Sequence, residues 1–570
     1  MVSRGSTEAR RAPRAAARRL EATFAAPFLR LGVVGRTAVA LLVLAGLANV
    51  VVLIGQAHGV LVWLYSNADN DAGFVLPKFA GSAAGSQINL GYHTFYEWWI
   101  FARVTVGLPG ARQLWELWPF VVSFAGFAVV AGCALATLGR WAALLTTVVL
   151  LSSGSALWLV IFTPESHLGA GLHAGLCCAA LLLVHRAATR RARWPAVLLL
   201  GVLIVALSVL GMTDPLIATG VLAPYIAAPL LCWWVAPSRA LGLTAAFAVV
   251  TGALILIGGS LIAHSLQSSG VVATPFPIDF VPASQLIGNL ENALAALTGL
   301  GNGAFFGLSA SGSGIYTAVA GGLCLLALAA ELFGLSVGAG RTALSARPAA
   351  AAAGAAGPAG LRDRVRLFSC FWGLALVITL GEFTLTTLGD AATGRYLIVG
   401  WTAAAALVGV LARSGRAREL TVVGVLAFAV LAARGSIQAG TPAPFGGAPS
   451  YSEVAAIEKF ARAHGAQVGF ASYWQASPIT YETDYRLRVY PIEACPTSPP
   501  FCMWNLAYIG EWYDVGHLHR TFLVTSPTTE PTDMISAPAG NLGAPLAATT
   551  VGQYTVDVYP YDIRSAFGTW

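Results

Sequence analysis

The chain has 570 residues, of which 56% are hydrophobic and only 10% are charged, and its net charge is +7. So few charged residues among so many apolar ones exclude an ordinary soluble globular protein. They favour a polytopic α-helical membrane protein, whose partner is the lipid bilayer.

The N-terminal segment 1–34 is basic and includes RRAPRAAARR, from Arg10 to Arg19. Basic residues beside a first apolar segment are typical of a signal that fixes this end in the cytoplasm, so we expect no nucleic-acid partner. The apolar segment that follows is too long for a signal peptide and has no convincing small-residue cleavage site. It is therefore predicted to remain as a membrane span.

A helix needs about 20 mostly apolar residues to cross a bilayer, and about eleven segments of the chain meet this requirement. They lie near 35–60, 113–138, 141–163, 168–185, 195–212, 215–236, 240–264, 314–337, 366–387, 395–412 and 418–434. Together they predict a transmembrane domain over 35–434, with a long first loop over 60–112.

The loops between these segments differ in charge. Loops on one side are basic, as in HRAATRRARW (185–194) and RSGRARE (413–419), whereas the loops on the other side hold most of the acidic residues. Because basic loops stay in the cytoplasm, the N-terminus is predicted inside and the acidic loops outside. An odd number of spans then places the C-terminus outside the plasma membrane.

Residues 435–570 are more polar and predict an extracytoplasmic α/β domain. SEVAAIEKFARAHG (452–465) has the period of an amphipathic helix, AQVGFASYW (466–474) and RTFLVTS (520–526) are typical of strands, and VGQYTVDVYPYDI (551–563) is typical of a hairpin. Cys495 and Cys502 lie seven residues apart in an exported segment. This spacing favours a local disulfide over a zinc site, for which we find no further ligands nearby.

Polar side chains gather on the predicted outer side. Asp69 and Asp71 follow the first span in YSNADNDAGF (65–74), and the same side carries Lys78, His93, Glu97, Glu165, His167, Arg395 and Tyr396. Ionisable residues beside lipid are usually retained for function or for pairing. Structural alternatives stay open: an aspartate such as Asp214 caps a helix, and an arginine snorkels to the interface. The first loop is amphipathic, and Trp98, Trp99, Trp115 and Trp118 are expected in an aromatic belt.

This arrangement resembles the GT-C superfamily of glycosyltransferases, which includes protein O-mannosyltransferases, the lipid A aminoarabinose transferase and mycobacterial arabinofuranosyltransferases. The resemblance rests on the acidic pair after the first span, the amphipathic first loop, the second outer loop with Glu165 and His167, GRYL (394–397) at the start of a late span, and the outer domain. The acidic motif is D-N-D rather than the D-E pair of mannosyltransferases, so the donor sugar stays open. The Arg and Ala bias is typical of a high-GC bacterial genome, and we expect an actinobacterial one.

The resemblance implies an inverting transferase that moves a sugar from a polyprenyl-phosphate donor to a cell-envelope glycan, glycolipid or exported protein. Asp69 or Asp71 would be the base that takes the proton of the acceptor hydroxyl. Three side chains would hold the departing phosphate: Arg395, Lys78 and His167. Four others would contact substrate: Glu165, Tyr396, His93 and Glu97.

A metal-dependent variant is the minority alternative, with Mg²⁺ or Mn²⁺ held by Asp69, Asp71, Glu165 and His167. Two other functions also stay open, namely a transporter or flippase of a lipid-linked intermediate and a non-catalytic scaffold that binds cell-wall polymer. The transporter is disfavoured because the span interiors carry few charges apart from Glu331 and Glu382 and we find no convincing repeat. A scaffold that only binds polymer would not need acidic residues, a cation and a histidine on the same side of the membrane, so this alternative is disfavoured too.

Overall fold

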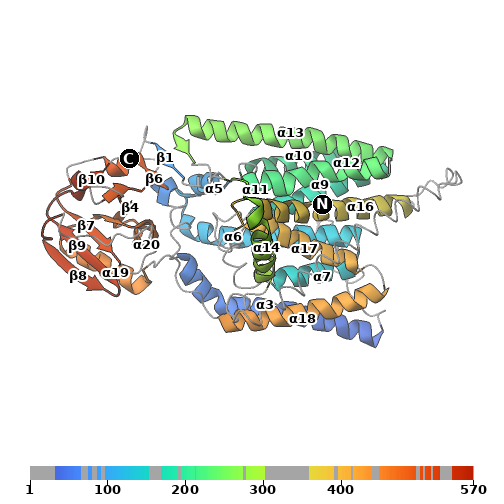
Figure 1. Ribbon diagram of the computed structural model, residues 1–570, viewed down its shortest axis with the longest axis horizontal. Helices are drawn as coiled ribbons and strands as arrows, with labels where there is room; N and C mark the ends of the chain where they lie inside the picture. Colours follow the sequence, from blue (N-terminus) through green and yellow to red (C-terminus); the bar gives the residue numbers. More distant parts are fainter. Residues whose placement is uncertain are drawn as a thin grey trace, which may run out of the picture.

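The computed structural model describes residues 32–65, 75–79, 87–90, 97–152, 169–190, 194–211, 214–273, 278–301, 358–389, 396–412, 415–439, 449–495, 501–504, 507–514, 518–526 and 542–568. Helices form most of this part of the chain. They assemble into a bundle, and a sheet-containing C-terminal region lies at one end of it (Figure 1). We call this end of the bundle the sheet end.

The bundle contains the following helices: α3 (Val33–Tyr65), α5 (Glu97–Thr105), α6 (Ala111–Thr137), α7 (Arg140–Leu151), α9 (Ala170–Arg190), α10 (Trp194–Gly211), α11 (Pro215–Ile217), α12 (Ala223–Val235), α13 (Arg239–Ser268), α14 (Leu286–Gly301), α16 (Pro358–Leu385), α17 (Ile398–Leu411) and α18 (Gly415–Ala439). A π-helix, Ala218–Leu222, connects α11 to α12. Each predicted span overlaps one or more of these helices except 314–337, which lies outside the described residues, as does the part 153–163 of the predicted span 141–163.

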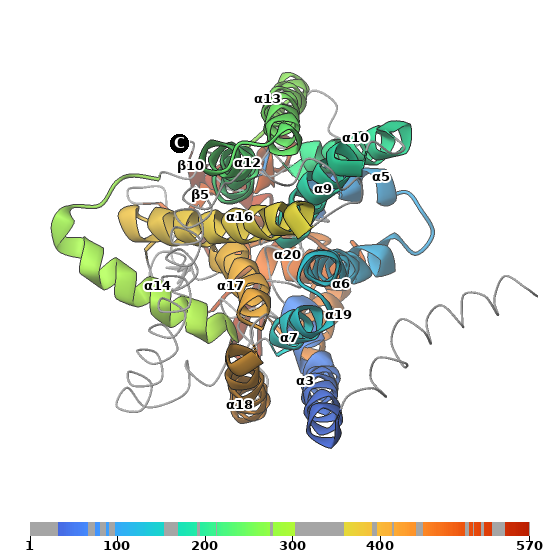
Figure 2. The same ribbon diagram turned by 90° about the vertical axis from the view of Figure 1, so that its right-hand side faces the viewer.

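Six of these helical segments are long and apolar enough to cross a membrane: Val33–Val52, Ala111–Thr137, Ala170–Thr189, Ala218–Val235, Arg239–Ser268 and Gly360–Leu385. Their length and composition fit a membrane-embedded protein. Most run along the bundle, whereas α14 runs across it (Figure 2). Asn289 of α14 donates to the carbonyls of Thr384 and Thr386, which fixes α14 against the end of α16.

Glycine allows close helix packing at two positions in the bundle. A Cβ added to Gly126 of α6 would lie 3.1 Å from the backbone nitrogen of Leu172 in α9. A Cβ added to Gly409 of α17 would lie 2.8 Å from Oγ1 of Thr146 in α7. Small residues at such contacts let helices approach and gain dispersion energy, which matters most where lipid removes the hydrophobic driving force.

The C-terminal region forms a seven-stranded sheet in the order β10-β5-β4-β3-β7-β9-β8. Its strands are β3 (Val468–Ala471), β4 (Arg488–Ala494), β5 (Phe501–Met503), β7 (Thr521–Thr525), β8 (Ala547–Val551), β9 (Tyr554–Tyr559) and β10 (Phe567–Gly568). The central strand β3 pairs in parallel with β4 and β7, and β9 pairs antiparallel with β7 and β8. The predicted amphipathic helix is α19 (Tyr451–Ala463), whose start is fixed by a capping box between Ser450 and Glu453.

The predicted strand over 466–474 is right only as far as Ala471. Ser472 is extended, and its carbonyl accepts from the backbone N–H of Ala476 at 2.9 Å, so the helix α20 (Tyr473–Glu482) begins directly after it. The strand expected at 520–526 is present as β7. A hairpin is present near the expected 551–563, but it consists of β8 and β9 and therefore starts four residues earlier and ends at Tyr559. The hairpin turns at Gly552, whose φ of 59° is accessible to glycine without strain.

A second, three-stranded sheet joins the bundle to the C-terminal region. Its middle strand, β1 (Ile88–Asn89) of the first loop, pairs with β2 (Val271–Val272) after α13 and with β6 (Tyr508–Ile509). The surrounding apolar cluster takes side chains from the first loop, α5, α6 and the C-terminal strands. Trp98, Trp99 and Trp115 lie in this cluster, at 2%, 3% and 0% exposure, so their predicted place in an aromatic belt is wrong.

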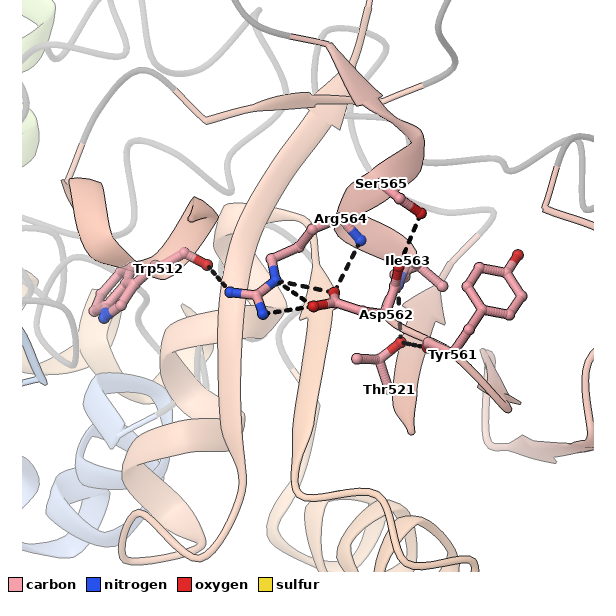
Figure 3. A network of polar contacts seen from close by, with 7 residues as sticks. All are labelled: Trp512, Thr521, Tyr561, Asp562, Ile563, Arg564 and Ser565. Atoms are coloured by element: carbon pink, nitrogen blue, oxygen red, sulfur yellow. Dashed lines mark hydrogen bonds and ion pairs between the residues drawn. The ribbon is translucent and has the colours of Figure 1, made fainter. Parts of the chain in front are cut away.

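Buried polar contacts tie the end of the chain to this region (Figure 3). The Arg564 guanidinium donates to both carboxylate oxygens of Asp562, with the shortest contact 2.6 Å, and to the carbonyl of Trp512 at 3.3 Å. Thr521 of β7 donates to the carbonyl of Tyr561 at 2.8 Å. These contacts hold the short helix Gly510–Tyr513, and with it the ring of Trp512, against the sheet.

Candidate functional site

A cavity of about 450 Å³ lies where the first loop, the start of α6 and the end of α20 meet. We call it the junction cavity. Its polar and aromatic lining side chains are those of Lys78, Arg112, Gln113, Tyr481, Asp484 and Tyr485. It therefore combines two phenol rings with cationic, anionic and amide groups, drawn from segments far apart in the chain.

Arg112 is held in one orientation at the wall of the junction cavity. Its guanidinium lies 3.0 Å from Glu116 within α6 and 3.0 Å from Glu482 of α20, and 4.2 Å above the ring of Tyr481. The Tyr481 hydroxyl donates to the same Glu116 carboxylate at 3.3 Å. Burial raises the pKa of Glu482, although Arg112 beside it acts in the opposite direction. This network joins α6 to α20 and fixes the two walls relative to each other.

The backbone is strained where α20 ends. Asp484 and Tyr485 both adopt the left-handed conformation, with φ of 51° and 62°. The N–H of Asp484 donates to the Tyr481 carbonyl and that of Tyr485 to the Thr480 carbonyl, so the pair closes the helix as glycine commonly does. Residues other than glycine pay a steric penalty there, and such strain clusters at functional sites.

Tyr485 and Lys78 meet on one side of the junction cavity. The Lys78 ammonium lies 5.4 Å from the centre of the Tyr485 ring, and Phe79 contacts the same ring edge-on at 5.7 Å. Phe79 also packs edge-on against Trp512 at 6.2 Å, and Arg564 holds the carbonyl of Trp512. A chain of contacts thus runs from the buried ion pair of Figure 3 to the cation at the cavity.

These groups suit a sugar or a sugar phosphate. A sugar ring offers C–H faces that pack on aromatic rings and hydroxyls that bond to carboxylate, amide and guanidinium groups. Lys78 is exposed, so its ammonium is accessible to an anion. The Arg112 guanidinium, in contrast, is already neutralised by two carboxylates and acts as a hydrogen-bond donor in a fixed position.

A second polar cluster lies in the bundle near the sheet end. Thr219, in the π-helix, donates to the Glu382 carboxylate of α16 at 2.7 Å. Asp214 is 1% exposed and accepts from the backbone N–H of Leu216 at 2.9 Å, so it caps α11, as its position in MTDP predicted. His173 of α9 packs so closely on Gly211 that a Cβ there would lie 2.3 Å from its Nε2. π-Helical turns are frequent at functional sites, which marks this cluster as a second candidate.

The structure describes only part of the predicted site. Lys78 lines the junction cavity, and Tyr396 begins the turn before α17 and packs half-buried against the bundle core. Glu97 begins α5. Cys495 and Cys502 are joined by a disulfide, which links the segment after β4 to β5. The others lie outside the described residues: Asp69, Asp71, His93, Glu165, His167 and Arg395.

A metal site on Asp69, Asp71, Glu165 and His167 likewise falls outside the described residues. Within the described ranges, no three His, Cys, Asp or Glu side chains are grouped to hold a metal ion.

Sequence analysis missed most of the junction cavity. Arg112, Tyr481, Asp484 and Tyr485 were not singled out, because the contact between Arg112 and Glu482 spans 370 residues of sequence. The available signal was weak: TYETDYR (480–486) places two acids and two tyrosines between a helix and a strand.

Comparisons of the chain with protein-family models, with curated proteins and with solved structures found no match. No relative therefore supplies a function, and the chemistry of the described residues has to carry the proposal.

Proposed function

We propose that the protein is an inverting glycosyltransferase of the GT-C type. The junction cavity is the observation that carries this proposal, because it presents sugar-binding chemistry beside the first loop. Lys78 follows Asp71 by seven residues in the same first loop, so the cavity and the acidic pair belong to one segment of the sequence. The donor is a polyprenyl-phosphate sugar, and the acceptor is a cell-envelope glycan, glycolipid or exported protein.

In the proposed reaction the acceptor hydroxyl oxygen attacks the anomeric carbon of the donor sugar. A new C–O bond forms as the bond from that carbon to the phosphate oxygen breaks, which inverts the configuration and releases the lipid phosphate. Asp69 or Asp71 takes the hydroxyl proton. Lys78, with Arg395 and His167, neutralises the charge that builds on the leaving phosphate.

The remaining predicted residues complete the proposed site. Glu165, Tyr396, His93 and Glu97 contact the sugars. In the minority variant, Mg²⁺ or Mn²⁺ would sit on Asp69, Asp71, Glu165 and His167 and neutralise phosphate charge.

The proposed orientation has about eleven spans, a cytoplasmic N-terminus and the sheet end outside the plasma membrane. Two observations support it. The last turns of α9 carry Arg186 and Arg190 beside His185, and His185 contacts Asp363 near the start of α16, which lies away from the C-terminal sheets (Figure 1). Glu382, one of the few charges within a span, lies within one turn of the end of α16, near the sheet end rather than at mid-depth. Chemistry at the membrane surface is therefore favoured over a transport path through its centre.

The test is the transfer of label from a panel of polyprenyl-phosphate sugars to envelope acceptors, with the full-length protein in membranes. Asp71→Asn or Asp69→Asn should lower transfer by about 10²- to 10⁴-fold if that carboxylate is the base. Lys78→Gln should lower it by about tenfold or more, because an exposed cation is lost from the phosphate.

The matched control is Lys459→Gln. Lys459 is the other lysine of the chain and is exposed on α19, so its loss should leave transfer unchanged. Full activity of both aspartate variants, or no transfer from any donor of a broad panel, would contradict the proposal. Comparison of membrane protein levels excludes loss of the protein as the cause.

A further inference from the structure

A second hollow lies in the side of the bundle between α3 and α18. Its lining residues are distant in sequence from those of the junction cavity, and none is shared. These helices run side by side along the bundle (Figures 1 and 2). The hollow, which we call the α3–α18 groove, has a volume of about 390 Å³. Its walls include Ala45, Ala48, Asn49, Ala429, Ala433 and Arg434. Alanines on both helices leave room that larger side chains would fill.

The groove has fixed walls. Asn49 is 5% exposed and its amide donates to the carbonyl of Ala45 at 2.9 Å and to that of Ala429 across the groove at 3.0 Å. A side-chain hydrogen bond between two helices in lipid sets their register. The two walls of the groove are therefore tied to each other at Asn49.

The outer faces of both helices are suited to lipid. Leu44 and Val51 of α3 are 61% and 66% exposed, and Val423 and Val430 of α18 are 65% and 62% exposed. Exposed apolar side chains at this density on apolar helices mark the surface that hydrocarbon covers. The groove opens on this surface, so what enters it from the bilayer is an apolar chain.

Arg434 gives the groove one cationic end. Its side chain is exposed, and among the described residues no hydrogen bond, ion pair or ring contact holds the guanidinium. It follows the uncharged stretch Leu420–Ala433, about 20 Å of helix, and lies close to the end of α18 from which the chain continues to the sheets. An arginine at this position reaches the headgroup layer by snorkelling.

We propose that the α3–α18 groove binds a lipid with an anionic phosphate headgroup, with its chain between the helices and its phosphate on Arg434. The guanidinium fork matches two phosphate oxygens, and the apolar walls match the chain. The site is separate from the proposed transfer reaction, because none of its lining residues lines the junction cavity. A lipid bound there joins the first and last described helices of the bundle.

The test uses the purified full-length protein in nanodiscs that contain photoreactive phosphatidic acid, with diacylglycerol of the same photoreactive chain as the uncharged probe. After irradiation, mass spectrometry maps labelled peptides. Phosphatidic acid should label the peptides around Ala48 and Ala433 about fivefold more than diacylglycerol. Arg434→Gln should reduce phosphatidic acid labelling to the diacylglycerol level.

Two matched variants test the groove itself. Ala48→Phe places a ring in the groove from an exposed position and should abolish labelling there by both probes. Val51→Phe adds the same ring to the lipid face of α3 outside the groove and should change nothing. If Ala48→Phe does not fold, as shown by size-exclusion chromatography, Arg434→Gln still decides, because its side chain is not packed.

Equal labelling by the two probes, or unchanged labelling of Arg434→Gln, would overturn the phosphate contact and with it the proposal. Crosslinks between two copies of the chain at these peptides, in place of lipid, would also overturn it by showing that a second copy covers the groove.

Discussion

The helical bundle and the C-terminal sheet region are held together by different interactions. In the bundle, contacts such as Gly126 on Leu172 depend on small residues, and the contacts of Asp363 with His185 and Arg366 lie at the end away from the sheets. The sheet region has a disulfide, a buried ion pair between Arg564 and Asp562, and exposed ion pairs around Glu458. Covalent and charge perturbations should therefore act on the sheet region and leave the bundle intact.

The junction cavity belongs to both regions and is where their difference matters. Its α6 wall is fixed by the bundle, whereas its α20 wall is fixed by the sheet. A change that loosens the sheet region should therefore disturb the cavity even though no residue of the bundle moves. The expected effects decrease in size from the disulfide to the surface charges.

The largest effect is expected from the disulfide. The double variant Cys495→Ser/Cys502→Ser should lower the free energy of unfolding of the sheet region by about 2.5 kcal/mol, because the unfolded chain regains the entropy of an eight-residue loop. Thermal unfolding of the detergent-solubilised protein, followed by aromatic fluorescence of the sheet region, measures this. A reducing agent should lower the wild-type transition similarly and leave the double variant unchanged. If the reducing agent left the wild-type thermal transition unchanged, the proposed role of the disulfide in the sheet region would be contradicted.

The next effect is expected where the two regions join. Arg112→Gln leaves Glu482, whose side chain is 6% exposed, without its cation. The loss should be about 2 kcal/mol, less than for a fully buried pair because the Arg112 side chain is 30% exposed.

The same thermal unfolding measures this loss, and a double-mutant cycle controls it. Arg112→Gln/Glu482→Gln should recover part of the stability, because neither charge is then left alone. Strictly additive losses would show that the two side chains do not interact and that α6 and α20 are joined by other contacts.

Much of the fold could be predicted from the sequence because its signals are local. Apolar length indicates the apolar helices, six of which are long enough to cross a membrane, and the capping box of Ser450 and Glu453 and the turn at Gly552 mark α19 and the hairpin. The boundary after Ala471 was mispredicted because Tyr473 and Trp474 have strong strand propensity, which the backbone bond from Ala476 to Ser472 overrides.

The candidate site was less predictable, for a physical reason. An amphipathic pattern indicates that Trp98 and Trp115 pack against an apolar surface, but it does not distinguish lipid from a folded domain. In this structure both side chains pack in the apolar cluster shared with the C-terminal region. Lys78 was recognisable as a cation close in sequence to the acidic pair Asp69 and Asp71. Tyr485 was not, because its left-handed backbone is a property of the folded turn and not of the local sequence.

A smaller effect is expected from the strained turn at the cavity. Asp484→Gly should raise stability by about 0.5 kcal/mol, because glycine adopts a φ of 51° without the steric penalty. The same change removes a carboxylate from the cavity and should reduce sugar transfer or binding. A protein that is more stable yet less active would show that the strain is retained for function.

The matched control for this turn is Asp514→Gly. Asp514 is exposed and has an ordinary φ of −62°, so glycine relieves nothing there and only increases the freedom of the unfolded chain. It should lower stability slightly. If both variants changed stability in the same direction, the backbone of Asp484 would not be the source of the effect.

The smallest effect is expected from pH. The hydrogen bond from Arg486, followed by that from Arg462, holds the pKa of Glu458 below its ordinary value of 4.5, although burial acts in the opposite direction. A carboxylate whose pKa is lowered on folding contributes stability that is present above the unfolded value and is lost as the pH falls through the folded value. The sheet region should therefore lose a little stability below pH 4.5, and Glu458→Gln should remove that loss.

Asp557 of β9 provides the opposite sign within the same sheet. Burial raises its pKa, so the folded state favours the protonated acid and loses stability as the pH rises through that raised value. Asp557→Asn should remove this loss on rising pH and leave the loss below pH 4.5 unchanged. Glu458→Gln should remove the loss below pH 4.5 and leave the loss on rising pH unchanged. If both variants changed the same part of the curve of stability against pH, the two carboxylates would not act independently in the sheet region. The difference between the sheet region and the bundle would then rest on the disulfide alone.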